Sequence, residues 1–194
     1  MLTGRQSAGS EILSHPRLGG SHYLQSEKRM VQKAQVPYAS LLVAAIVLII
    51  AVFCDSPQRF ALTSSSPPAH RLTYLWFHAN IVHAIFNVWC LLAFVAVYEL
   101  KTLPLLISIV ITAGCPSVVL PEAPVVGMSG VCFALMGMAA LKSRAFIKYN
   151  LYALSFISVG FLFPFVAAWL HLYCYVAGIA AGCVLYTIGK CNRR

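Results

Sequence analysis

A serine in a glycine-rich stretch has the setting that a nucleophile needs. Ser129 lies between Gly127 and Gly130, at the start of an apolar segment that continues past Ala140. At a helix N-terminus, unpaired N–H groups and the helix dipole would stabilise an oxyanion next to the serine. Packing is the alternative, because small residues let membrane helices approach closely. The other polar residues at this depth decide between the two interpretations.

Two further polar sets lie in other apolar segments. His83 and Asn87 are four residues apart, which places them about 40° from each other on one helix face. His78 falls on a different face and nearer the surface, where it can support this pair. His171 stands near the start of the last apolar segment. For a single histidine, an interhelical hydrogen bond is as good an explanation, but Ser129 and these residues together could supply a nucleophile, a base and oxyanion donors.

A glycine stripe follows His171. Gly178 and Gly182 lie seven and eleven residues after it, so that all three fall within about 20° of one line on a helix. Glycines in such a line let one membrane helix press against another. The stripe therefore predicts close helix packing directly below the histidine.

The composition predicts an integral membrane protein. Of 194 residues, 60% are hydrophobic and only 10% are charged, whereas about a quarter are charged in soluble domains. The net charge of +9 comes from Lys and Arg in short clusters between apolar segments. This is an orientation signal, so we expect no nucleic-acid partner. The seven cysteines stand singly without metal-ligand spacing, so we expect no disulfide, metal or cofactor.

Six apolar segments are long enough to act as membrane helices. They cover about residues 36–54, 72–100, 103–120, 125–141, 149–163 and 167–188. With both termini cytoplasmic, 12 of the 14 Lys and Arg lie on the inner side, as the positive-inside rule requires. The sequence thus predicts an all-α protein with six transmembrane helices, of which the second, fourth and sixth begin at the outer face.

The domain organisation follows from these segments. The composition of residues 1–36 predicts a basic, disordered cytoplasmic tail, within which Met30 is an alternative start of the protein. Residues 37–188 form the membrane domain, and residues 189–194 a basic cytoplasmic C-terminus. Oligomeric state has no signal in the sequence.

The polar motifs resemble those of the rhomboid intramembrane serine proteases. The matching runs are His78-x4-His83-x3-Asn87, Gly127-Met128-Ser129-Gly130 and His171-Leu172-x5-Gly178. The resemblance covers about residues 37–188, a six-helix region, and Glu99 also matches an acidic position common in the family.

The resemblance implies a catalytic dyad, in which Ser129 attacks the scissile carbonyl and His171 takes its proton. It further implies that His83, Asn87 and the Ser129 N–H stabilise the oxyanion, and that Phe133 packs beside the histidine. The substrates would be transmembrane proteins cut near the outer face of the plasma (inner) membrane, by a multi-pass enzyme embedded in the bilayer. Water would reach the dyad from outside, and helix five with the loop through Pro164 is the candidate gate.

Two departures from the family pattern leave alternatives open. The last motif usually reads His-x-x-Gly-x-x-x-Gly, but here Cys174 takes the first glycine position. A shift by four residues would put Tyr175 in the histidine position; we prefer the first register, because His171 is the only histidine after Ser129. If Tyr175 faced Ser129, the protein would be a proteolytically inactive rhomboid-like protein that binds transmembrane helices. The loop after the first helix also lacks the Trp-Arg pair of many members. A small transporter is a weaker alternative, since no internal repeat is evident.

Overall fold

The computed structural model describes residues 36–120 and 122–191. The chain divides into two units, residues 1–33 and 34–194, and every helix below belongs to the second. The predicted N-terminal tail, apart from its last residue, and the alternative start at Met30 lie outside the described residues. So do residues 192–194 of the predicted C-terminus, whereas residues 189–191 continue the last helix.

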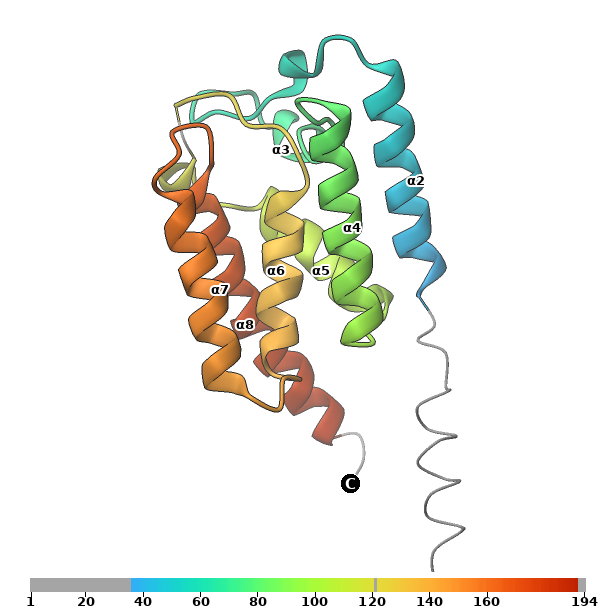
Figure 1. Ribbon diagram of the computed structural model, residues 1–194, viewed down its shortest axis with the longest axis vertical. Helices are drawn as coiled ribbons and strands as arrows, with labels where there is room; N and C mark the ends of the chain where they lie inside the picture. Colours follow the sequence, from blue (N-terminus) through green and yellow to red (C-terminus); the bar gives the residue numbers. More distant parts are fainter. Residues whose placement is uncertain (1–35, 121, 192–194) are drawn as a thin grey trace, which may run out of the picture. The chain divides into compact units, whose positions relative to one another are not determined.

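The regular structure of the described residues is helical, apart from one isolated bridge. The longer helices are α2 (Tyr38–Phe53), α4 (Ile81–Val97), α5 (Thr102–Ala113), α6 (Ser129–Ala140), α7 (Phe146–Gly160) and α8 (Ala168–Cys191). A short helix α3 (His70–Thr73) and two 3-10 turns, η1 (Pro57–Phe60) and η2 (Ser117–Val119), lie in the connections. Helices α4, α6 and α8 all run downward in the view of Figure 1, each beginning at its own upper end.

Helix α4 begins later than its apolar segment. Residues 72–100 were predicted as one span, but the helix starts at Ile81. Asn80 is the reason: its backbone is extended and its side chain accepts a hydrogen bond of 2.8 Å from the His83 N–H, which caps the helix. The prediction that His78 lies on this helix is therefore wrong, because His78 belongs to the preceding loop.

Helices α5 and α6 are also shorter than their apolar segments. Helix α5 ends at Ala113 and not near residue 120. Residues 122–128 are not helical, and Val125 forms an antiparallel bridge with Leu62 through hydrogen bonds of 2.8 and 3.0 Å. With 12 residues, α6 is about 18 Å long, well short of a hydrocarbon core of about 30 Å. In Figure 1, α6 begins below the upper end of α4.

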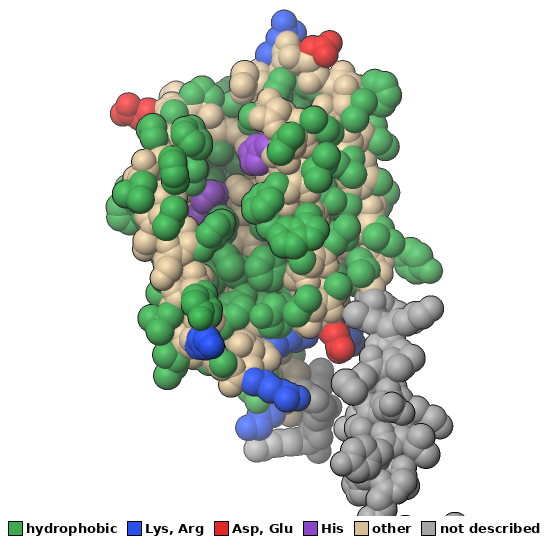
Figure 2. Space-filling view, viewed as in Figure 1, with side chains coloured by type: hydrophobic (Ala, Val, Ile, Leu, Met, Phe, Trp, Pro, Cys, Tyr) green, Lys and Arg blue, Asp and Glu red, His purple; other side chains and the backbone are tan. Residues whose placement is uncertain are grey.

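A length and composition criterion for membrane spans selects one helix in the described part of the chain. Helix α8, with 24 residues, is long and apolar enough to cross a bilayer. Helices α2, α4, α5 and α6 are apolar but shorter. Figure 2 shows hydrophobic side chains over most of the visible face; Lys and Arg gather at the end where α8 finishes, and basic side-chain atoms are also visible at the opposite end. The six predicted spans therefore stay a prediction, within an architecture that is all-helical.

Helix α6 is the centre of the packing. It contacts α4, α5, α7 and α8, and ten of its 12 residues are buried. Its closest partner is α8: a Cβ on Gly178 would lie 2.2 Å from the Ala134 carbonyl oxygen, and one on Gly137 would lie 2.2 Å from the Tyr175 carbonyl oxygen. At Gly182 an added Cβ would lie 3.2 Å from the Met138 Cα. Backbone thus meets backbone along this seam, which fixes the start of α8 relative to the start of α6.

Charged side chains donate hydrogen bonds to carbonyl groups at helix C-termini at both ends of the bundle. Arg71 donates hydrogen bonds to the carbonyls of Ala113 and Cys115, at the C-terminus of α5, where a cation is favourable. At the other end, Lys142 donates to the carbonyls of Tyr98 (2.7 Å) and Glu99 (3.2 Å). Burial lowers the pKa of Lys142, and the Glu99 carboxylate partly offsets this by raising it.

Candidate active site

Ser129 and His171 lie within hydrogen-bond distance of each other. The Ser129 Oγ is 2.9 Å from the His171 Nε2. Ser129 is the first residue of α6, and His171 lies in the first turn of α8, so the pair depends on the close α6–α8 seam. Both residues are half-buried, which leaves the pair accessible from one side. A serine hydroxyl this close to an imidazole has the geometry of a nucleophile with its base.

Tyr175 does not face Ser129. Its hydroxyl donates a hydrogen bond of 2.6 Å to the Asn150 Oδ1 on α7, and the residue is 1% exposed. Tyr175 comes four residues after His171, about 40° around the helix and one turn further along it. The first of the two sequence registers therefore matches the structure, with His171 against Ser129.

An aromatic stack supports the imidazole. The Phe133 ring lies parallel to the His171 ring, with centroids 4.3 Å apart and planes inclined by 22°. Phe156 of α7 stacks on Phe133, with ring centroids 5.9 Å apart, a contact that was not predicted from the sequence. The position of Phe133 one turn after Ser129 explains why its side chain reaches the same level as the histidine.

His83 and Asn87 lie on the face of α4 that packs on α6. Asn87 is 3% exposed; its side-chain amide donates to the His83 main-chain carbonyl (3.1 Å), and the Asn87 main-chain carbonyl accepts from the Cys132 Sγ (3.4 Å). The His83 ring lies against Gly127, where an added Cβ would be 2.9 Å from the ring Cε1. The His83 ring is therefore next to the segment that leads into Ser129, and Asn87 lies next to Cys132, one turn into α6.

His78 also contacts the segment that leads into Ser129. Its Nε2 accepts a hydrogen bond from the Met128 N–H at 3.3 Å, and its ring meets the His83 ring edge-on at 5.1 Å. Gly127 has a φ of +121°, a conformation that suits glycine, and its N–H donates to the Tyr74 carbonyl (2.9 Å). These contacts fix the backbone immediately before Ser129.

Gly130 and Cys174 fit together where α6 crosses α8. A Cβ on Gly130 would lie 2.5 Å from the Thr112 Cγ2 and 3.2 Å from the Cys174 Sγ. The Cys174 thiol donates to the Thr112 Oγ1 at 3.7 Å. The cysteine at the family's glycine position is thus accommodated, because α5 provides a polar partner and Gly130 leaves room.

Two residues of the site were not singled out from the sequence. Asn80 caps α4 and thereby sets where the helix that carries His83 begins. The Tyr74 carbonyl accepts a hydrogen bond from the Gly127 N–H. An asparagine directly before an apolar periodic run is a helix-start signal that could have identified the first. A backbone carbonyl acceptor such as that of Tyr74 has no sequence signal.

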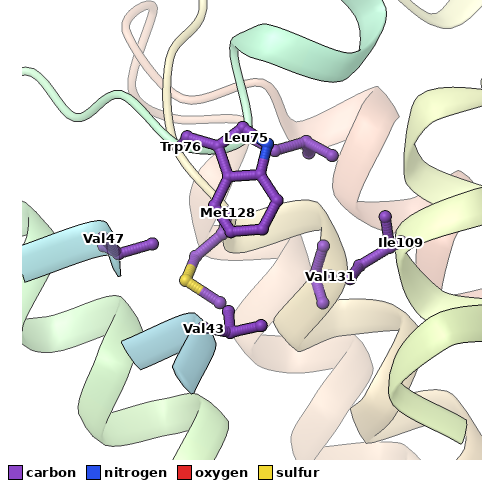
Figure 3. A pocket seen from close by; sticks show the side chains of 7 residues that line it. All are labelled: Val43, Val47, Leu75, Trp76, Ile109, Met128 and Val131. Carbon is purple, nitrogen blue, oxygen red and sulfur yellow. The ribbon is translucent and has the colours of Figure 1, made fainter. Parts of the chain in front are cut away.

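A small apolar cavity lies beside Met128, away from His171. Its volume is about 10 Å³, and every side chain that lines it is apolar, as Figure 3 shows. The Met128 side chain points toward it while the Met128 N–H donates to His78. A cavity of this size holds one water molecule at most, so it is a packing gap and not a ligand site. Over the described ranges, no three His, Cys, Asp or Glu side chains group as metal ligands.

Comparison with known proteins agrees with the motifs. The rhomboid domain family model matches residues 68–188, more than half of the chain. A search of curated proteins gave no match. The matched residues include Ser129 and His171 together with His78, His83 and Asn87. The chain belongs to the rhomboid family and is a membrane-embedded helical protein.

Proposed function

We propose that this protein is an intramembrane serine endopeptidase with a Ser129/His171 dyad. The observation that carries the proposal is the 2.9 Å separation of the Ser129 Oγ and the His171 Nε2. Membership of the rhomboid family supports it, because that family consists generally of intramembrane serine proteases. The substrates are transmembrane proteins, which the enzyme cleaves near the outer membrane face.

The chemistry begins with His171 in its neutral form. Its Nε2 accepts the hydroxyl proton of Ser129, and the Nδ1 carries the ring hydrogen. As the Ser129 Oγ attacks the scissile carbonyl, the proton passes to Nε2, and His171 then donates it to the leaving amine. Water hydrolyses the acyl-enzyme in the second half of the reaction, again with His171 as the base. The Phe133 stack keeps the imidazole in one orientation through these transfers.

The oxyanion has donors on two helices. No side chain caps the start of α6, so the N–H groups of its first turn are available where the helix dipole favours negative charge. Asn87 uses one amide hydrogen on the His83 carbonyl, and its second hydrogen, with the His83 ring, serves the oxyanion. His78, Gly127 and Gly130 position this backbone, while Gly178 and Gly182 hold α8 against it.

The membrane arrangement completes the proposal. Six helices within residues 37–188 cross the plasma (inner) membrane, with residues 1–36 and 189–194 in the cytoplasm. The upper ends of α4, α6 and α8 then face outward, and the Lys and Arg at the opposite end face inward (Figure 2). The dyad thus lies near the outer face, where water and an unwound substrate segment can both reach it.

The test is cleavage of a model transmembrane substrate by the purified chain in lipid vesicles. Ser129→Ala and His171→Ala should each abolish cleavage, since removal of either dyad member typically costs several orders of magnitude. Ser129 should also react with a fluorophosphonate probe, whereas exposed Ser65 should not. A folded wild-type protein that neither cleaves a panel of substrates nor takes up the probe would favour the inactive, helix-binding alternative.

A further inference from the structure

The loop between α7 and α8 has no polar side chain. Residues 161–167 read Phe-Leu-Phe-Pro-Phe-Val-Ala, and Trp169 follows in the first turn of α8. Connecting loops usually carry polar and turn-forming residues, because they run through water. An entirely apolar loop with three phenylalanines therefore indicates a different surrounding.

The phenylalanine and leucine side chains of this loop are exposed. Phe165 is 81% exposed, Leu162 76% and Trp169 63%, and Val118 of the neighbouring turn η2 is 89% exposed. The loop and η2 also border an apolar cleft of about 200 Å³. An apolar surface of this kind is rarely left in water and marks a contact with a protein or a membrane.

Another connection at this end of the bundle is polar. The loop between α2 and α4 carries exposed Asp55, Gln58 and Arg59. In Figure 1 both connections lie at the upper end, one beside α2 and the other above α7 and α8. At this end, the α2–α4 loop thus carries charged side chains and the α7–α8 loop carries none, while exposed Glu122 lies in the α5–α6 connection.

We propose that the α7–α8 loop lies in the interfacial layer of the lipid bilayer, with Phe165, Leu162 and Trp169 inserted among the lipids. The exposed apolar face of α7, including Phe156 at 58% and Val159 at 50%, runs directly into the loop, so the lipid that covers the helix continues over it. Aromatic side chains favour this layer, where Trp and Tyr are enriched in membrane proteins. The partner is the lipid surface, and the cleft beside η2 opens onto it.

The loop that contacts lipid is connected directly to the start of α8. The Ala167 carbonyl accepts the His171 N–H at 3.0 Å, so the end of the loop and the first turn of α8 are one continuous unit. Phe161 meets Trp169 edge-on at 5.0 Å and closes the loop on itself. The lipid contact therefore fixes the depth of the helix that carries His171, whether or not the protein is a protease.

The experiment compares two single cysteine variants of the full chain in phosphatidylcholine nanodiscs, in which both membrane faces are open to reagent. Phe165→Cys tests the loop, and Gln58→Cys, also exposed, is the matched control in the polar α2–α4 loop. A charged maleimide should label residue 165 about tenfold or more slowly than residue 58, because apolar surroundings exclude the reagent and disfavour the thiolate. Site-resolved peptide mass spectrometry separates the new thiols from the seven native cysteines.

A second readout separates lipid contact from burial in protein. A bimane dye attached at residue 165 in denaturant-free detergent, then reconstituted, should be quenched by lipids that carry a nitroxide near the headgroup, and a dye at residue 58 should not. Equal labelling rates at the two positions would overturn the proposal, and so would slow labelling at residue 165 without quenching. Neither measurement uses cleavage, so failure here is distinct from failure of the dyad.

Discussion

The ring of Phe133 stacks on the imidazole of His171, with centroids 4.3 Å apart and planes inclined by 22°. Ser129 holds the same imidazole only through one hydrogen bond at Nε2, which leaves rotation about that bond to be restrained by packing. In the proposed dyad, the aromatic ring thus provides the orientation that a third acidic residue provides in a triad.

Phe133→Ala should therefore lower kcat by about tenfold or more, because misorientation of a catalytic group is costly. Phe133→Tyr should retain most activity, since the ring is kept. Steady-state cleavage of a transmembrane substrate measures both, and Phe94→Ala, a half-buried phenylalanine on α4, is the control. An unchanged kcat in a folded Phe133→Ala protein would mean that the stack has no catalytic role.

Gly178→Ala should destabilise the fold. The new methyl carbon would lie 2.2 Å from the Ala134 carbonyl oxygen, so α6 and α8 would have to separate. Overpacking of this kind costs about 1–3 kcal/mol, and the separation should also weaken the Ser129–His171 contact. The free energy of unfolding in detergent measures the effect. Ala180→Leu, on an exposed position of α8, should be neutral, and equal stability of the two variants would contradict the close approach.

His78→Ala should lower kcat more than it changes KM. The buried Met128 N–H would lose its acceptor, and an unsatisfied buried donor costs about 1–3 kcal/mol. Relaxation of this backbone would move Ser129, the next residue. His78→Gln should restore part of the rate, because its side-chain oxygen can accept the same hydrogen bond.

His70→Ala is the matched control for His78. His70 bonds the Ala61 carbonyl at 2.7 Å in the polar connection and makes no contact with Met128. It should alter stability without changing kcat. If both variants reduce kcat equally, the effect of His78 is a general loss of folding and not positioning of Ser129.

Tyr175→Phe should keep cleavage activity. The hydroxyl bonds Asn150 on α7 and not Ser129, so its loss should cost about 1 kcal/mol of stability, as for other interhelical bonds in membranes. Tyr186→Phe, on an exposed position of the same helix, provides the comparison for thermal unfolding. Loss of cleavage with unchanged stability would instead point to Tyr175 as the residue that acts on Ser129.

The residues that lie around Ser129 were identifiable from the sequence because few residue types can act as a nucleophile, a base or an oxyanion donor. The spacing of His83 and Asn87, the glycines around Ser129 and the single later histidine led to the rhomboid family, which the family match confirms. The roles of these residues stay a prediction.

The sequence by itself determined the membrane class, the all-helical architecture and the residue types that could do chemistry, because hydropathy and residue identity report directly on solvent and reactivity. Helix limits were decided by the tertiary structure. Residues 74–80 and 122–128 are apolar or nearly so, yet not helical; residues such as Tyr74 and Met128 are buried in protein, where neighbouring chain segments satisfy the backbone. The tertiary structure also decided that His171, and not Tyr175, faces Ser129, because this depends on how closely Gly178 lets α8 approach α6.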